Sequence, residues 1–183
     1  MKRIWTFLAE GFEVVEALTV VDILRRAKFE VTTVSITDDL YVTSSHNVVV
    51  KADKKMAELE TQLPDMIFLP GGMPGTLNLG ASEELKKIIT DAAGQGKWMA
   101  AVCAAPSVYG EMGLLQGRKA TCYPGFEEKL TGAEYQAQDV VVDGTFITSQ
   151  GMGTCISLGL KLVELLDSKE TAMQLKESIR YMN

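Results

Sequence analysis

Residues 97–109 read KWMAAVCAAPSVY, and this stretch predicts the architecture of the chain. Residues 98–102 carry no charge and follow a glycine-rich break, which is typical of a strand buried on both faces. Pro106 fits only the first turn of a helix, because proline lacks an N–H group. A helix must therefore begin at or just after Cys103, and we expect the chain to pass from strand to helix with Cys103 at the corner.

Such a corner is typical of a nucleophile elbow, which presents one side chain at the carboxyl end of a parallel sheet. The small residues Ala101, Ala104 and Ala105 leave room for the tight turn. A thiol at a helix N-terminus faces unpaired N–H groups and the positive end of the helix dipole, so the sequence predicts a lowered pKa for Cys103. This stretch alone leaves open that Cys103 is an inert buried cysteine.

The composition indicates a single globular domain over residues 1–183. No apolar run approaches the roughly 20 residues that span a membrane, and residues 4–8 are too short for the core of a signal peptide. We therefore expect a cytoplasmic protein with no membrane partner. The net charge of −6 disfavours a nucleic-acid partner, because phosphate contacts need clustered lysine and arginine.

The number and spacing of the cysteines and the histidine indicate which metal sites the chain could form. Cys103, Cys122 and Cys155 are widely separated, there is no CxxC pair, and His46 is the single histidine. This pattern disfavours a zinc site, and we expect no metal and reduced thiols.

Strands and helices are expected to alternate along the chain. The predicted strands cover residues 3–8, 30–36, 65–69, 98–102 and 118–122, with hairpins within 41–51 and 139–148. The predicted helices cover residues 13–26, 83–93, 155–166 and 169–181, with one after Cys103 and a short one within 54–60. This order predicts an α/β fold whose mainly parallel sheet has helices on both faces and binds ligands at the carboxyl ends of its strands. The segments expected at that edge are residues 11–16, 71–75, Cys103 and 150–154.

Several sequence blocks together resemble the ThiJ/PfpI family. They are LAEGFEVVEA at 8–17, VVDILRRA at 20–27, FLPGGMPGTLNL at 68–79, AVCAAP at 101–106 and TSQGMGT at 148–154. Their order and spacing extend over almost the whole chain. The resemblance implies a flavodoxin-like three-layer sandwich, a homodimer, and chemistry at the elbow cysteine without a cofactor.

The resemblance also implies roles for individual residues. Cys103 would be the reactive cysteine, and Glu16 the acid that hydrogen-bonds it. The N–H groups of Gly72 and Ala104 match the donors of an oxyanion hole. The residues expected beside the site are Gly71, Tyr123 and Gly151.

Glu16 has apolar neighbours, so we expect it to be partly buried. A buried carboxyl beside a thiolate cannot easily ionise as well, so the pair is expected to hold one proton between them. A neutral Glu16 would donate a hydrogen bond to the sulfur and pass a proton to a substrate. The alternative role for Glu16 is a partner for the helix dipole, and Glu13 is expected to be a solvated charge at the helix start.

The chain departs from the family at Tyr123. Family members with a Cys–His pair often carry histidine at this place, and no histidine follows the elbow here. Tyrosine, with a pKa near 10, is a poor base at neutral pH. This weakens the interpretation as a PfpI-type hydrolase and favours a ring that packs beside the site.

One hypothesis is that a partner subunit completes the site through the bend at residues 43–49. In the resembling family this region lies near the dimer interface, and a basic residue there approaches the reactive cysteine of the partner. The matching position here is His46, and Arg26 lies on the helix that follows Glu16. Together they could hold an anionic substrate group, or lower the pKa of Cys103 from across the dimer interface. The alternative is a solvated histidine in a polar turn.

The leading functional prediction is an enzyme of the glyoxalase III or deglycase type. Its substrates would be α-oxoaldehydes such as methylglyoxal, or their protein adducts. Cys103 would add to the aldehyde, Glu16 would move the proton, and the N–H groups of Gly72 and Ala104 would hold the oxyanion. The alternatives are a non-enzymatic redox sensor that acts through oxidation of Cys103, and a cysteine hydrolase.

Overall fold

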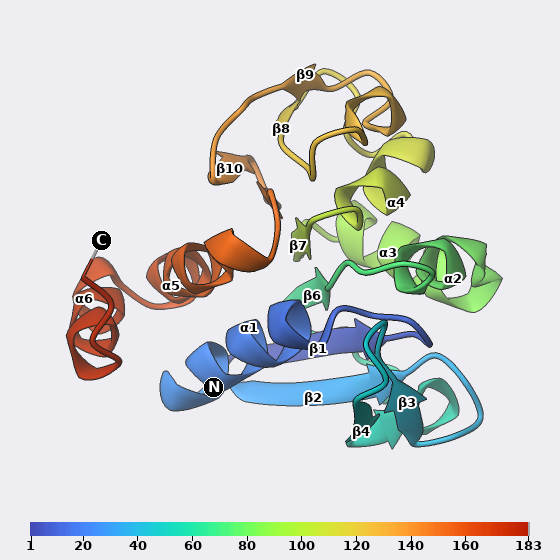
Figure 1. The fold of residues 1–183 in the computed structure, drawn as a ribbon, viewed down its shortest axis with the longest axis horizontal. Helices are drawn as coiled ribbons and strands as arrows, with labels where there is room; N and C mark the ends of the chain where they lie inside the picture. The colour runs from blue at the N-terminus through green and yellow to red at the C-terminus, as the bar shows by residue number, and fades with distance from the viewer. Residues whose placement is uncertain (183) are drawn as a thin grey trace.

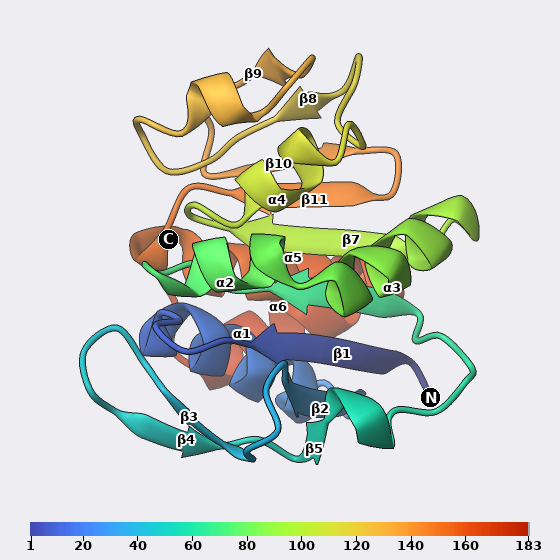
Figure 2. The same ribbon diagram turned by 90° about the vertical axis from the view of Figure 1, so that its right-hand side faces the viewer.

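The structure is a computed structural model that describes residues 1–182; residue 183, the last of the predicted domain, lies outside the described part. Within it, seven strands form one central sheet (Figure 2). They are β1 (Arg3–Leu8), β2 (Glu30–Ser35), β5 (Lys54–Lys55), β6 (Met66–Leu69), β7 (Trp98–Val102), β10 (Val140–Asp143) and β11 (Phe146–Ser149). Their order is β10-β11-β7-β6-β1-β2-β5, and the neighbours are parallel except for the β10–β11 hairpin.

Helices cover both faces of this sheet (Figures 1 and 2). One face carries α1 (Val14–Arg26), α5 (Cys155–Leu166) and α6 (Lys169–Ser178). The other face carries α2 (Gly75–Ala81), α3 (Glu83–Gly94) and α4 (Pro106–Glu111). The predicted three-layer α/β sandwich with a mainly parallel sheet is confirmed.

The two helical layers bury two separate apolar clusters, one on each face of the sheet. Strand β6 shows the division, because successive side chains of a strand point to opposite faces. Met66 and Phe68 join the cluster under α1 and α5, whereas Ile67 and Leu69 join the cluster under α3 and α4. All four side chains are fully buried, as expected for a strand covered on both sides.

Two predicted helix starts are confirmed by their caps. The side chain of Glu13 accepts a hydrogen bond from the Val15 N–H before α1. The Ser82 hydroxyl accepts one from the Leu85 N–H before α3, at 3.2 Å. Both caps satisfy donors that have no partner within the helix. The predicted hairpins are also present, as β10–β11 and as β3 (Tyr41–Thr43) with β4 (Val49–Lys51).

Several predicted elements differ from the structure. Residues 118–122 do not enter the central sheet; only β8 (Lys119–Ala120) forms, and it pairs with β9 (Glu134–Tyr135) in a separate small sheet. Residues 54–60 form β5 and a 3₁₀ turn, Met56–Glu58, rather than an α-helix. Helix α2 was not predicted, because Pro74, Gly75 and Gly80 made its sequence look like a loop. None of the helices in residues 1–182 is long and apolar enough to cross a membrane.

Candidate active site

Cys103 occupies a strained corner directly after β7. Its φ is +64°, in the left-handed region that residues other than glycine rarely adopt. The corner is held from two sides, because the Cys103 N–H donates to the Ser149 carbonyl at 2.9 Å and the Tyr123 N–H donates to the Cys103 carbonyl at 2.8 Å. This is the strand-to-helix elbow that the sequence predicts, although α4 begins only at Pro106.

Glu16 reaches this corner from the first turn of α1. Its side chain is buried, with 2% of the residue exposed. One carboxyl oxygen, Oε2, accepts a hydrogen bond from the Gly71 N–H at 2.9 Å. The carboxyl group is also hydrogen-bonded to the thiol of Cys103. The acid and the thiol therefore form a contact pair out of bulk water.

Gly71 lets the acid and the thiol come together. A Cβ atom at position 71 would lie 2.6 Å from the Cβ of Cys103 and 2.8 Å from Oε2 of Glu16. Both distances are shorter than any ordinary contact, so a side chain at this position would push the pair apart. The Gly-rich segment after β6 is thus explained by a close approach to the elbow.

Two backbone N–H groups point at the sulfur. The N–H groups of Ala104 and Gly72 both hydrogen-bond Cys103. Gly72 has a φ of +93°, a conformation that favours glycine. These are the donors that the sequence predicts for an oxyanion hole, and the structure places both beside the thiol.

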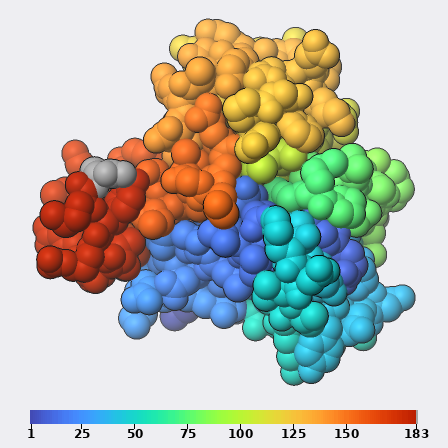
Figure 3. Space-filling view, viewed as in Figure 1, coloured from blue at the N-terminus to red at the C-terminus, as the bar shows by residue number. Residues whose placement is uncertain are grey.

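The pair opens into a pocket of about 490 Å³. Residues 13–16, Gly72 and Cys103 line it, together with His46, Tyr123 and Met152 from more distant segments. In the space-filling view these parts of the chain meet near the middle of the face (Figure 3). The pocket therefore gathers the segments that the sequence places at the carboxyl edge of the sheet.

Residues 2–165 match the DJ-1/PfpI family. The chain belongs to this family. Among solved structures, Toxoplasma gondii DJ-1, described as oxidized, has a TM-score of 0.96 and 36% identity, with all of both chains covered. A mutant of a DJ-1 superfamily protein from Salmonella typhimurium also gives 0.96, at 31% identity and full coverage of both chains.

The curated DJ-1/PfpI relatives carry several names. Parkinson disease protein 7 homolog of Danio rerio is 34% identical over 96% of this chain and 95% of its own length. A deglycase of Pyrococcus abyssi is 30% identical over 90% of this chain and 99% of its own length. Protein DJ-1 homolog B of Arabidopsis thaliana is 37% identical over 94% of this chain, but the chain spans only 40% of that relative.

The electrostatics of this DJ-1/PfpI site differ from the sequence prediction. Burial raises the pKa of Glu16 to about 7. Burial and the adjacent Glu16 carboxyl raise the pKa of Cys103 to about 12, so the predicted lowering of the Cys103 pKa is wrong. The N–H groups of Ala104 and Gly72 oppose this rise but do not cancel it. Helix α4 has only six residues and begins after the elbow, so its dipole has little effect on the sulfur.

The two pKa values define two protonation states of the pair below about pH 12. Below about pH 7 both groups are protonated, and above it Glu16 is ionised while Cys103 keeps its proton. Above about pH 7 the pair holds one proton, but this proton resides on sulfur and the charge on Glu16, so the predicted neutral Glu16 that donates to a thiolate is wrong. A carboxylate with a pKa near 7 that contacts a thiol is suited to take the proton from sulfur when the sulfur attacks a carbon.

We expect Cys103 to react faster with iodoacetamide than the other thiols at neutral pH, by roughly tenfold or more. Cys103 is partly exposed and lines the pocket, whereas Cys122 and Cys155 are 0% exposed. Burial raises the pKa of Cys122 to about 12, as for Cys103, and that of Cys155 further, so access to the reagent is what distinguishes Cys103 from Cys122. Peptide mass mapping over a time course measures the three rates, and equal labelling of either inner thiol would contradict the expectation.

The raised pKa of Glu16 predicts that wild-type stability decreases with pH. The folded chain binds this proton more tightly than the unfolded chain, so the stabilisation is complete below the ordinary pKa of 4.5 and is lost as the pH rises through about 7. Relative to Glu16→Gln, the wild type should lose about 2–3 kcal/mol of unfolding free energy between about pH 5 and 8. Urea unfolding of both proteins at the two pH values measures this difference, and a constant difference would contradict it.

Three of the remaining predicted site residues lie at or beside the pocket, and the fourth, Arg26, does not. Tyr123 lines the pocket, and its ring lies 3.5 Å from the position of a Cβ added at Gly151, so both residues lie beside the site. His46 lines the pocket of its own chain, and its approach to a partner subunit stays a prediction. Arg26 does not line this pocket; it lies ten residues, or about 15 Å of helix, beyond Glu16 and pairs with Asp22.

Glu13 is the pocket residue that the sequence interpretation misjudged. Its side chain is only 15% exposed, rather than solvated as expected. It accepts a hydrogen bond from Ser45 at 3.0 Å and lies 3.3 Å from a ring nitrogen of His46. No local pattern in the sequence predicts this contact, because residues 45 and 46 lie on a hairpin more than thirty residues along the chain.

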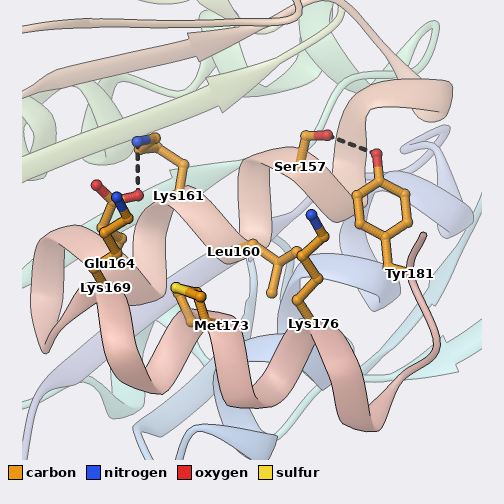
Figure 4. Close-up of a pocket in the computed structure, with 9 residues that line it drawn as sticks. Ser157, Leu160, Lys161, Glu164, Lys169, Met173, Lys176 and Tyr181 are labelled. Carbon is orange, nitrogen blue, oxygen red and sulfur yellow. Dashed lines mark hydrogen bonds and ion pairs between the residues drawn. The ribbon is translucent and has the colours of Figure 1, made fainter. Parts of the chain in front are cut away.

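A separate groove of about 260 Å³ lies between α5 and α6 (Figure 4). Its lining includes the pair Lys161–Glu164 at 2.7 Å and the hydroxyls of Ser157 and Tyr181, which lie 2.8 Å apart. None of its lining residues is a cysteine or a histidine. Residues 1–182 also contain no group of three or more cysteine, histidine or acidic residues placed to hold a metal ion. The acid–thiol pair is therefore the candidate centre for chemistry.

Proposed function

We propose that the chain is a cofactor-independent enzyme that converts α-oxoaldehydes such as methylglyoxal, or their protein adducts, into 2-hydroxy acids. The observation that carries the proposal is the buried hydrogen bond between Glu16 and Cys103, beside two N–H donors and an open pocket. The Pyrococcus abyssi relative that is called a deglycase supports this class of activity.

In the first step the sulfur of Cys103 attacks the aldehyde carbon. The Glu16 carboxylate takes the thiol proton as the carbon–sulfur bond forms. The aldehyde oxygen becomes negative and lies one bond from the sulfur, within reach of the N–H groups of Gly72 and Ala104. Glu16 then gives its proton to this oxygen, and the product is a hemithioacetal.

In the second step Glu16 moves a proton between adjacent carbons. Its carboxylate removes the hydrogen from the carbon bound to sulfur, which gives an enediolate. The hydroxyl proton of that carbon passes to the oxygen of the former ketone, and Glu16 returns its own proton to the former ketone carbon. The former ketone carbon becomes a carbinol, and the carbon on sulfur becomes a thioester. The two carbons exchange oxidation levels within the substrate, and hydrolysis of the thioester releases a 2-hydroxy acid.

Formation of lactate from methylglyoxal, with no added cofactor, tests this proposal. Purified protein should produce lactate and consume methylglyoxal in equal amounts. The reaction should need no thiol additive, because Cys103 supplies the sulfur. Adduct formation without any lactate would contradict the proposal.

A second candidate function is redox sensing through Cys103. Its partly exposed sulfur, next to Glu16 and the N–H groups of Ala104 and Gly72, has donors that would hold the oxygens of a sulfinate. Treatment with hydrogen peroxide, followed by mass analysis of the Cys103 peptide, tests this role. Oxidation of Cys103 without lactate production in the untreated protein would favour the sensor over the enzyme.

The proposal includes a homodimer. Apolar side chains remain exposed on α1 and on the neighbouring hairpin, among them Val15 at 43%, Leu18 at 38% and Val49 at 58%. Large exposed apolar patches often mark protein interfaces. We expect light scattering to give about twice the chain mass of 20.0 kDa, and Leu18→Glu to reduce it to one chain. A wild-type mass of one chain would contradict the dimer.

A further inference from the structure

A polar trio at the pocket mouth has no part in the steps described above. Ser45 donates a hydrogen bond from its hydroxyl to Oε2 of Glu13 at 3.0 Å. Nδ1 of His46 lies 3.3 Å from the same carboxylate oxygen and 3.0 Å from the Ser45 hydroxyl. Glu13 and His46 both line the pocket of Cys103. The trio therefore brings an imidazole from a distant hairpin to the pocket that Cys103 lines.

The contacts of His46 define the roles of its two ring nitrogens. The Ser45 hydroxyl hydrogen is directed to Glu13, so Nδ1 serves as the donor to these oxygens. A neutral imidazole with its proton on Nδ1 carries a lone pair on Nε2. Nε2 is therefore the nitrogen that can accept a proton, and the Glu13 carboxylate orients the ring from the Nδ1 side.

The trio is fixed to the site by backbone bonds. The Ser45 N–H donates to the Phe12 carbonyl at 2.8 Å, and the Glu13 N–H donates to the Gly71 carbonyl at 2.8 Å. The Glu13 side chain caps α1, the helix that also carries Glu16. These bonds thus hold the backbone of Ser45 and Glu13, the two partners of His46, against the helix start and the Gly-rich segment.

The hydrolysis step needs a base that meets water, and the buried acid is poorly placed for it. Glu16 is 2% exposed and is bound to Gly71 and Cys103. The side chain of His46 is 77% exposed at the pocket mouth, and it is the single histidine of the chain. The two groups therefore suit different steps: one contacts the sulfur, and the other contacts solvent.

We propose that His46, oriented by Glu13, is the base that activates water to hydrolyse the thioester on Cys103. Nε2 takes a proton from water, and the water oxygen bonds to the thioester carbon. The carbon–sulfur bond then breaks, the departing sulfur takes the proton, and the 2-hydroxy acid leaves. The proposal rests on the function proposed above. His46 would take the place of the histidine that family members with a Cys–His pair often carry where this chain has Tyr123.

Rapid quenching of the reaction with methylglyoxal tests the role of His46. His46→Gln should form the Cys103 adduct at the wild-type rate, but lactate production should fall by roughly 10²-fold. The adduct should accumulate with the mass of one methylglyoxal, and hydroxylamine should release it, as expected for a thioester. Glu13→Gln should show a smaller loss, and added imidazole should restore part of the rate of His46→Gln. Lys51→Gln, an exposed change on the same hairpin, is the control.

An unnatural ester separates failure of this inference from failure of the proposed function. With p-nitrophenyl acetate, wild type and His46→Gln should both release one p-nitrophenolate per Cys103 in a burst, and only the later steady phase should slow in the variant, by roughly 10²-fold. This result would support the inference even if methylglyoxal is not a substrate. Equal steady phases, or equal loss of burst and steady phase, would overturn it.

Discussion

Replacing Cys103 with serine should reduce lactate formation from methylglyoxal by roughly 10³-fold or more. The hydroxyl of serine is a far weaker nucleophile than sulfur, and Glu16 with a pKa of about 7 is too weak a base to activate it. The fold should persist, because the two side chains differ by one atom and the corner is held by backbone bonds. Lactate production measured enzymatically, with circular dichroism as a check of folding, gives the result.

Cys122→Ala and Cys155→Ala are the matched controls for this substitution. Both thiols are fully buried and lie outside the lining of the pocket. Each variant should keep wild-type turnover once its thermal stability is taken into account. Turnover in Cys103→Ser close to that of the wild type would remove Cys103 from the mechanism.

Replacing Glu16 with glutamine should reduce the same turnover by about 10²- to 10⁴-fold. Glutamine keeps the length of the side chain and a hydrogen-bond donor for the sulfur, but it cannot accept the thiol proton. Glu16→Asp should also lose activity, because its carboxylate is one methylene short of the sulfur.

Glu30→Gln removes an exposed carboxylate on β2, so this variant is the control for the loss of one negative charge. Its turnover should equal that of the wild type. If Glu16→Gln also kept wild-type turnover, another group would have to move the proton, and the mechanism proposed here would fail.

The elbow could be predicted from the sequence because its signals are local. An uncharged strand, small residues and Pro106 lie within a few positions of Cys103, and only a sharp strand-to-helix corner satisfies them together. The layers could be predicted for the same reason, since alternating strands and helices imply a parallel sheet. Helix α2 could not, because its sequence GTLNLGA has weak helix propensity and is stabilised by packing, with Leu79 fully buried.

The electrostatics of the site could be predicted only in part. The burial of Glu16 follows from its apolar neighbours, so the sequence could predict that Glu16 and Cys103 do not both ionise near neutral pH. The pKa of Cys103 could not be predicted from the sequence. It depends on the balance between burial and the adjacent carboxyl, which raise it, and two backbone N–H donors, which lower it. The contact of His46 with Glu13 could not be predicted either, because it depends on how the hairpin bend packs against the start of α1.

The central claim is that the Glu16 carboxylate takes the thiol proton from Cys103, and the pH profile of kcat/KM for methylglyoxal tests it most directly. This parameter reports the ionisation of the free enzyme. It should rise with pH through a midpoint of about 7, the pKa of Glu16, and then level off. Glu16→Gln should lack this midpoint. A wild-type profile that is flat across neutral pH, or a midpoint near 7 that persists in Glu16→Gln, would contradict the account.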